Sequence, residues 1–365
     1  MIKPLEPIDA LKYFSVGGDL VDFTPHGSGL INTTYFASYN TNGVRRNYIL
    51  QAINTEIFTN PTELMQNIWS VTEYLNKKCA GKEKTLRIIP TADGEGDLFY
   101  KAPDGICWRL YDFVENTVCL DAPRTKADFF ESGYAFGNFQ HLLADFPAET
   151  LFETIPDFHN TPKRFEALIE AEKQDKCKRA AGVQAELDFF KKRESFTHRL
   201  IDAERYGELQ LRVSHNDTKI NNVLFDKDTG KAACVIDLDT VMPGYSVTDF
   251  GDAIRFGAST ASEDEPDLNK VNLDMERFAT YTDGFLKGCQ GSLPQKEIML
   301  LPEGAKMMTL ECGIRFLTDY LNGDVYFKTT RENQNLDRTR THIKLVSEME
   351  KSWDDMKRIV ASYCK

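Results

Sequence analysis

Short apolar runs separated by glycine turns make up the beginning of the chain, a pattern typical of β-strands. Three such stretches are "TPHGSGLINTTYFASY", "RRNYILQAI" and "LRIIPTADGEGDLFYKAPDGICWRLYDFV". Between the second and the third, "NPTELMQNIWSVTEYLNKK" has Leu64, Ile68 and Val71 at helical spacing. Asn60 is the expected N-cap of this helix, and Pro61 suits its first turn. This order predicts a small antiparallel sheet with one helix packed on it.

The hydrophobic pattern changes after Asn116 to long helical segments. Three of them are "KADFFESGYAFGNFQHLLADF", "MMTLECGIRFLTDYLNGDVYF" and "IKLVSEMEKSWDDMKRIVASY". We therefore predict an α+β fold with two lobes. The sheet-rich N-terminal lobe is expected at residues 1–113, a hinge at 114–117 and a larger, mainly helical C-terminal lobe at 118–365. A ligand is expected in the cleft between the lobes.

Composition and charge narrow the classes of function. Of the 365 residues, 41% are hydrophobic and 27% are charged, which suits an ordinary globular protein. The net charge of -12 argues against a nucleic-acid partner, because binding a phosphate backbone needs concentrated Lys and Arg. No stretch has the pattern of a signal peptide or of a membrane span, and the eight cysteines occur singly without a CxxC pair. We expect a cytoplasmic monomer without a membrane partner.

Carboxylates and amides gather in "VSHNDTKINNVLFDKDTGKAACVIDLDT". Its two apolar runs, "NVLFD" and "AACVIDL", flank the turn residues "DKDTG" and predict a β-hairpin. The hairpin would bring Asp217 and Asn222, which lie before its first strand, close to Asp237 at the end of its second. Such oxygen ligands suit magnesium that takes its other ligands from water and phosphates.

The segment "HNDTKINN" fits the spacing His-x-Asp-x-x-x-x-Asn and resembles the catalytic loop of the protein-kinase-like fold. The A-P-E and V-A-I-K motifs of protein kinases are absent. The chain is therefore more similar to the aminoglycoside phosphotransferase and choline kinase superfamily of small-molecule kinases. The resemblance implies ATP and Mg²⁺ as cofactors, with the nucleotide bound by the N-terminal lobe.

Five longer segments of the sequence resemble one group of kinases within this superfamily. These are "RVSHNDTKINNVLFD", "VIDLDTVMPGYSVTDFGDAIRFGAST", "INTTYF", "YILQAIN" and "ECGIRFLTDYLNGDVYF". Together they resemble the N-acetylhexosamine 1-kinases of that superfamily, which phosphorylate GlcNAc and GalNAc on the anomeric oxygen. The implied partner is a small amino sugar. Two alternatives stay open: a kinase of choline, homoserine or an aminoglycoside, and a nucleotide-binding pseudokinase.

The resemblance assigns a role to each polar residue of the loop. Asp217 would be the catalytic base, and Asn222 and Asp237 would hold the metal. Lys219 would lie near the transferred phosphoryl group, with a solvated surface lysine as the alternative. Asp239 is either a second metal contact or a helix cap.

Four residues are expected to support the loop rather than to react. His215 would brace it through hydrogen bonds, because an aspartate already fills the role of the base. "DFGDAIRFGAST" follows the metal aspartate, so Asp249, Asp252 and Arg255 would brace the loop as well.

In the first lobe, Gly27 and Gly29 lie in a turn whose N–H groups would cover nucleotide phosphates. Asn32 and Thr33 follow the turn and would support it or contact the nucleotide. The strand "YILQAIN" carries Gln51 where the protein-kinase-like fold usually has a phosphate-binding lysine. Either other groups hold the phosphates, or the assumed strand register is wrong.

Two further sites follow from the resemblance. "RLYDFVENT" fits the hinge, where adenine would bond to backbone groups near Phe113 and Glu115. For the sugar, Glu311, Arg315 and Asp319 stand four apart and would share one helix face. The alternative for these three is a ladder of surface ion pairs.

Overall fold

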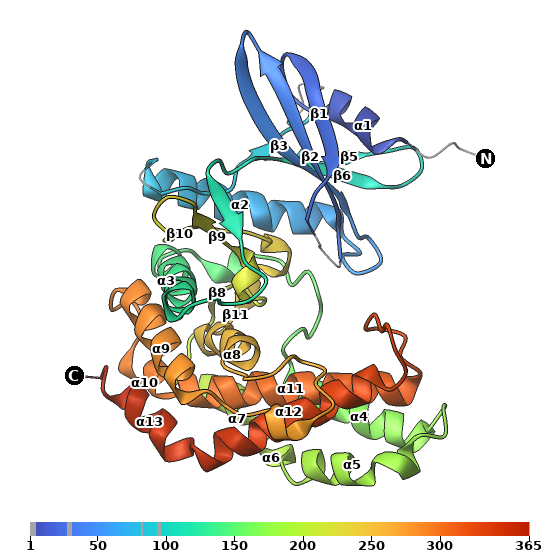
Figure 1. Ribbon diagram of the computed structural model, residues 1–365, viewed down its shortest axis with the longest axis vertical. Coiled ribbons are helices and arrows are strands. Elements are labelled where there is room, and N and C mark those ends of the chain that lie inside the picture. Colours follow the sequence, from blue (N-terminus) through green and yellow to red (C-terminus); the bar gives the residue numbers. More distant parts are fainter. Residues whose placement is uncertain (1–4, 28–30, 82, 93–95, 365) are drawn as a thin grey trace.

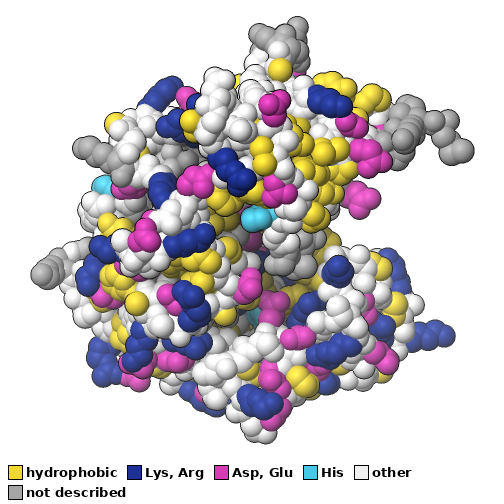
Figure 2. All heavy atoms as spheres, turned by 45° about the horizontal axis from the view of Figure 1, so that its top comes forward, with side chains coloured by type: hydrophobic (Ala, Val, Ile, Leu, Met, Phe, Trp, Pro, Cys, Tyr) yellow, Lys and Arg dark blue, Asp and Glu magenta, His cyan; other side chains and the backbone are white. Residues whose placement is uncertain are grey.

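The computed structural model describes residues 5–27, 31–81, 83–92 and 96–364. A six-stranded antiparallel sheet forms the upper part of the molecule and a group of helices forms the lower part (Figure 1). The surface is hollowed between the two parts, and hydrophobic side chains border this hollow (Figure 2). This arrangement confirms the α+β prediction of a small antiparallel sheet followed by a larger helical region.

The strands of the upper sheet are β1 (Asp19–Pro25), β2 (Thr33–Thr41), β3 (Val44–Ile53), β4 (Ile88–Ile89), β5 (Tyr100–Lys101) and β6 (Cys107–Asp112). Their order is β1-β2-β3-β6-β4, and β5 also pairs with β6. In this register Gln51 of β3 stands opposite Thr34 of β2 on one side and Arg109 of β6 on the other. The sheet thereby brings together polar side chains that are far apart in the sequence.

Helix α2 (Pro61–Cys79) packs on one face of this sheet. Asn60 caps it by accepting a hydrogen bond from the Glu63 amide, and Pro61 occupies its first turn, as predicted. Its apolar residues join side chains of β3, β4 and β6 in one cluster. The short helix α1 (Pro7–Ala10) belongs to a second cluster with residues of β2, β3 and β6. The cluster with α2 also includes Phe139 and Val213 of the lower region, so it joins the sheet to that region.

The two regions are connected between β6 and β7 (Thr117–Cys119), and β7 pairs with the hairpin of β9 (Val223–Asp226) and β10 (Ala232–Val235). This hairpin confirms the one predicted from "NVLFD" and "AACVIDL". A second pair is formed by β8 (Arg212–Ser214) and β11 (Met242–Gly244). The segment between β8 and β9 is the predicted catalytic loop, so it is held at both ends by strands.

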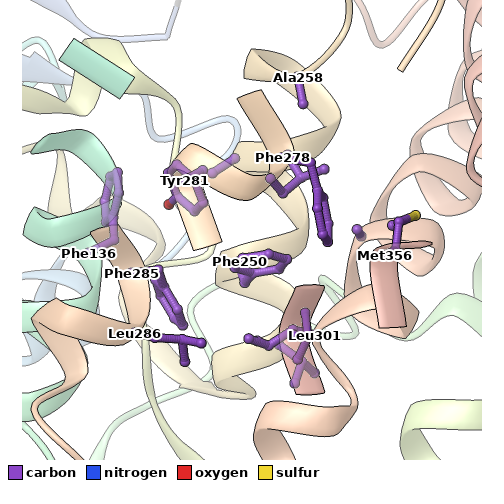
Figure 3. Close-up of a cluster of buried hydrophobic side chains, with 14 of the residues drawn as sticks. Phe136, Phe250, Ala258, Phe278, Tyr281, Phe285, Leu286, Leu301 and Met356 are labelled. Atoms are coloured by element: carbon purple, nitrogen blue, oxygen red, sulfur yellow. The ribbon is translucent and has the colours of Figure 1, made fainter. Parts of the chain in front are cut away.

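The lower region contains α3 (Lys126–Leu142), α4 (Thr161–Gln174), α5 (Gln184–Lys191), α6 (Glu194–Thr197), α7 (Arg199–Arg205), α8 (Ser246–Gly257), α9 (Met275–Cys289), α10 (Gln295–Met299), α11 (Leu301–Asn322), α12 (Gln334–Lys351) and α13 (Trp353–Ala361). Phe250 of α8 lies at the centre of its core, against the rings of Phe278, Tyr281 and Phe285 of α9 (Figure 3). Helix α8 follows β11 directly, and β11 pairs with the strand before the predicted catalytic loop. The core around Phe250 therefore supports that loop.

Helices α3 and α9 approach each other through glycines. Gly133 and Gly137 of α3 and Gly284 and Gly288 of α9 each face backbone atoms of the other helix, where a Cβ atom would overlap. The spacing of four places each pair on one helix face. This close contact holds α3 beside the helix that packs on Phe250.

Within the described residues, no helix combines the length and the apolar character needed to cross a membrane. All eight cysteines are described, and each is a free thiol.

Gly137→Ala is expected to lower the free energy of unfolding by about 1–3 kcal/mol, because the added methyl group must push the helices apart. Gly182→Ala is the matched control, since a Cβ atom there meets nothing within 4 Å. Urea unfolding followed by circular dichroism compares the two variants. Equal stability would contradict the role assigned to the close contact.

Candidate active site

The catalytic loop places three predicted residues in direct contact. The Lys219 ammonium lies 2.9 Å from one carboxylate oxygen of Asp217. The side-chain amide of Asn222 donates to the other carboxylate oxygen at 3.0 Å and to the Asp217 carbonyl at 2.8 Å. The carboxylate is therefore oriented from both sides, while Asp217 itself stays partly exposed.

A buried carboxylate of α8 holds the start of this loop. Asp249 accepts the backbone N–H groups of His215 and Asn216 at 2.9 and 2.8 Å, and the Gln140 side chain donates to it at 2.8 Å. Burial raises the pKa of Asp249. These hydrogen bonds confirm that Asp249 braces the loop.

One helical turn further on, Asp252 accepts the Thr218 backbone N–H at 3.0 Å and the Arg255 guanidinium at 2.8 Å. These hydrogen bonds confirm that Asp252 and Arg255 brace the loop, as predicted. Both side chains are almost fully buried. The catalytic loop is thus tied to two successive turns of α8.

His215 contributes hydrogen bonds on both ring nitrogens. Nε2 lies 2.9 Å from the Ile236 carbonyl, and Nδ1 lies 3.3 Å from the Asp217 backbone N–H. These partners fit the tautomer with its proton on Nε2, because a carbonyl accepts and an amide donates. The rings of Phe136 and Phe139 pack against the imidazole. Neither nitrogen is left for proton transfer, so the bracing role expected of His215 is confirmed.

Asn222 and Asp237 offer oxygen atoms for a metal. Within the described part of the chain, neither the Asn222 side-chain oxygen nor the Asp237 carboxylate takes part in a hydrogen bond. Desolvation by the surrounding protein, together with the nearby carboxylates of Asp239 and Asp217, raises the pKa of Asp237 to about 7, although the residue is exposed. A divalent cation would offset this accumulation of negative charge.

The described residues contain no group of three or more His, Cys, Asp or Glu side chains arranged to hold a metal. One carboxylate and one amide oxygen suit magnesium, which keeps waters and binds substrate phosphates. The residues present therefore fit the implied cofactor.

Asp239 has a different role from the two that were expected. Its carboxylate pairs with Arg109 at 2.5 and 2.9 Å and accepts the Asn32 side-chain amide at 2.6 Å. It makes no capping hydrogen bond in the short helical turn that contains it. The helix-cap alternative is therefore wrong. A metal contact would require Asp239 to leave partners that already satisfy it.

Gln51 lies on β3, opposite Thr34 of β2 and Arg109 of β6. Its side-chain oxygen accepts from Arg109 at 3.0 and 2.8 Å, and its amide donates to the Thr34 hydroxyl at 3.0 Å. Arg109 is not among the residues predicted from the sequence, although a charged residue inside the apolar strand "CWRLYD" is a signal. Gln51 is thus already engaged within the protein.

The turn between β1 and β2 is described only in part. Gly27 has a φ of +74°, a conformation that favours glycine. Gly29 lies outside the described residues. Asn32 bonds to Asp239 and accepts the Asn54 backbone N–H at 3.0 Å, and Thr33 is the exposed first residue of β2. Phosphate binding by this turn stays a prediction.

The hinge presents two unused backbone groups. The Phe113 N–H donates to the Asn47 carbonyl, and the Glu115 carbonyl accepts from Lys84, both at 2.9 Å. Among the described residues, the Phe113 carbonyl and the Glu115 N–H form no hydrogen bond. These two groups are an acceptor and a donor, as adenine binding requires, and the adenine contact at both residues stays a prediction.

The three residues expected at the sugar do not share one environment. Glu311 has 0% exposure, and its oxygens bind His159 at 2.8 Å and the Thr161 hydroxyl at 2.6 Å. Asp319 is also buried and accepts three backbone N–H groups from residues 325–327 as well as the Asn335 side chain. Both carboxylates have protein partners, so we no longer expect either one to contact the substrate.

Arg315 differs, because it has no carboxylate partner among the described residues. The rings of Phe158, Tyr326 and Phe327 lie 5.4, 5.8 and 5.5 Å from its guanidinium carbon. Burial and the neighbouring Arg315 lower the pKa of Arg164, so a second cation lies near the first. We call Arg315 with its three rings the arginine–aromatic cluster. The sequence analysis named the arginine but missed the rings and Arg164.

The cluster is connected to the catalytic loop. His159 bonds Glu311 of α11 through one ring nitrogen, and its other nitrogen lies 3.4 Å from the Asn216 carbonyl. Arg315 stands one helical turn beyond Glu311. This segment of α11 therefore lies on the same side of the molecule as the loop that carries Asp217.

The family model described as "Phosphotransferase enzyme family" (APH) matches residues 22–279. The chain belongs to this family. The matched range includes both the N-terminal sheet and the catalytic loop, and it confirms the expected protein-kinase-like fold.

Several solved structures share this phosphotransferase fold. A microcompartment-associated aminopropanol kinase has a TM-score of 0.62 at 17% identity, covering 96% of this chain and 97% of that one. Spectinomycin phosphotransferase, in complex with ADP and spectinomycin, has a TM-score of 0.55 at 14% identity, covering 96% and 99%. Plasmodium vivax ethanolamine kinase has a TM-score of 0.54 at 13% identity, covering 88% and 82%. At these identities the similarity shows the fold alone.

Asp249→Ala is expected to destabilise this phosphotransferase, because each buried N–H group that loses its acceptor costs about 1–3 kcal/mol. The catalytic rate should fall as well, since the loop loses its anchor. Asp354→Ala, at a side chain with 94% exposure, is the control and should leave both properties unchanged. Urea unfolding and the initial phosphorylation rate measure the two effects. An unchanged rate in Asp249→Ala would contradict the bracing role.

Proposed function

We propose that this phosphotransferase is a kinase that uses ATP and Mg²⁺ to phosphorylate the anomeric hydroxyl of N-acetylhexosamines. The family establishes a phosphotransferase, and the resemblance in sequence favours GlcNAc and GalNAc as acceptors. The observation that supports the choice of acceptor is the arginine–aromatic cluster, because a cationic substrate bound beside Arg315 would meet the protein's own positive charge.

Asp217 is the proposed base. Its carboxylate is oriented by Asn222 and Lys219, and it is partly open to the cleft, so an acceptor hydroxyl can reach it. In a direct transfer, Asp217 accepts the hydroxyl proton as the anomeric oxygen attacks the terminal phosphoryl group in line. The bond from this phosphorus to the bridging oxygen breaks, and ADP leaves. The positive charge of Lys219 stabilises the negative charge on the phosphoryl oxygens. No covalent enzyme intermediate is needed.

Asn222 and Asp237 would hold magnesium through the oxygen atoms that form no hydrogen bond in the described chain. Bound there, the metal supplies positive charge for the phosphate oxygens of the nucleotide. The Phe113 carbonyl and the Glu115 N–H would bind adenine at the hinge. The solved spectinomycin phosphotransferase contains ADP, which supports the choice of an adenine nucleotide.

The acceptor argument rests on charge. Aromatic rings attract cations such as choline, but Phe158, Tyr326 and Phe327 already surround the Arg315 guanidinium. Arg164 adds a second positive charge nearby. A cationic amino alcohol would be repelled here. A neutral sugar would not, because its hydroxyl groups and N-acetyl carbonyl accept hydrogen bonds from a guanidinium.

The proposal is tested with Mg²⁺-ATP and a panel of GlcNAc, GalNAc, glucose, choline, ethanolamine, homoserine and an aminoglycoside. Phosphorus NMR identifies the phosphorylated oxygen. We expect an anomeric phosphate on both acetylated sugars. In Asp217→Asn the rate should fall by about 10²–10⁴-fold, the usual contribution of a general base. ADP binding should persist in this variant.

Turnover of choline, ethanolamine or homoserine alone would reject the sugar and retain the kinase. ADP binding without turnover of any acceptor would favour the pseudokinase alternative. An unchanged rate in Asp217→Asn would reject Asp217 as the base.

Arg315→Met is expected to raise the KM for GlcNAc at least tenfold with a smaller change in kcat, because the substitution removes hydrogen bonds made in the bound substrate and in the transition state alike. Arg205→Met is the control for loss of an exposed arginine. Steady-state kinetics at saturating ATP separates the two constants. A KM equal to that of the control would remove Arg315 from the acceptor site.

A further inference from the structure

A partly buried chain of hydrogen bonds links the N-terminal sheet to the turn that follows Asp237, the proposed metal ligand. It runs from Thr34 through Gln51 and Arg109 to Asp239, and then to Asn32. Both ends return to the start of β2, next to the glycine turn. We call these five residues the interlobe chain.

We propose that Arg109 and Asp239 are positioning residues for the nucleotide phosphates. By fixing Asn32 and the start of β2 relative to Asp237, they would serve in place of the phosphate-binding lysine that the protein-kinase-like fold usually has on this strand. This inference rests on the nucleotide use proposed above and does not depend on the acceptor.

The guanidinium of Arg109 already donates hydrogen bonds to protein groups, which supports a positioning role rather than direct contact with a phosphate. Arg109 is 1% exposed, and its guanidinium donates to both oxygens of Asp239 and twice to the oxygen of Gln51. The Met65 sulfur lies 3.9 Å from one guanidinium nitrogen of Arg109, and the centre of the Tyr111 ring lies 5.3 Å from its guanidinium carbon. Its charge is already matched by Asp239, so its effect on a ligand must pass through the groups that it holds.

Geometry explains why an arginine is needed. The planar guanidinium presents several N–H groups in a fixed fork and can bind a carboxylate and an amide oxygen together. A lysine is a point charge and cannot hold both Asp239 and Gln51 in this way. Gln51 stands opposite Arg109 in the strand register, so the residue that occupies the usual lysine position serves as an acceptor for the arginine.

Asn32 connects Asp239 to the start of β2, beside the turn that is expected to bind the phosphates. Its amide donates to Asp239 at 2.6 Å, and its oxygen accepts the Asn54 backbone N–H at 3.0 Å, so it is held from the lower region and from the end of β3. Asp239 is two residues after Asp237. The start of β2 is therefore fixed relative to the proposed metal ligand by one side chain.

The test compares a ligand with phosphates and one without. Calorimetry measures the binding of ADP and of adenosine to the wild-type protein, Asn32→Ala and Arg109→Lys. We expect ADP affinity to fall at least tenfold in both variants, while adenosine affinity stays within twofold, because adenosine needs only the hinge. The KM for ATP should rise more than kcat falls. Arg45→Met, at an exposed arginine of β3, is the control and should match the wild type.

Asn32→Ala leaves the buried ion pair intact, so it decides the matter even if Arg109→Lys does not fold. ADP affinity equal to that of the wild type in Asn32→Ala would overturn the inference. An equal loss of ADP and adenosine affinity would also overturn it, because it indicates a general structural defect. If the wild-type protein binds neither ligand, the proposed use of an adenine nucleotide fails as well.

Discussion

The carboxylate of Asp249 fixes the position of the catalytic loop, and the candidate active site depends on it. Its oxygens accept the backbone N–H groups of His215 and Asn216, which directly precede Asp217. The next residue of α8, Phe250, lies at the centre of the helical core. The proposed base is therefore anchored to a well-packed part of the protein. Changes in the walls of the cleft can alter what binds there without moving the base.

Features encoded by neighbouring residues could be predicted from the sequence. The spacing of His215, Asp217 and Asn222 identifies the loop, and Asp217 makes hydrogen bonds with the other two residues inside it. The hairpin that follows depends on two apolar runs and one short turn, and the helix cap at Asn60 depends on the residues just after it. In each of these features, the residues that interact lie within one short stretch of sequence. That stretch is therefore sufficient to predict the feature.

Features that join distant residues could not be predicted in the same way. Arg109 and Asp239 are 130 residues apart in the sequence, and nothing near either one indicates the other. On α11, the spacing of Glu311 and Asp319 correctly suggests a shared face, but the helix is buried on several sides. Neighbouring segments therefore supply different partners at each turn: His159 at one end and the backbone of residues 325–327 at the other.

In the proposed acceptor site, the arginine–aromatic cluster offers a route for a change of acceptor preference during evolution. The rings of Phe158, Tyr326 and Phe327 would attract a quaternary or primary ammonium group if the guanidinium among them were absent. Replacing Arg315 with a small residue would free those rings and remove one positive charge in a single step. A sugar-binding and an amine-binding member of such a lineage would then be separated by very few substitutions, with an unchanged catalytic loop in both.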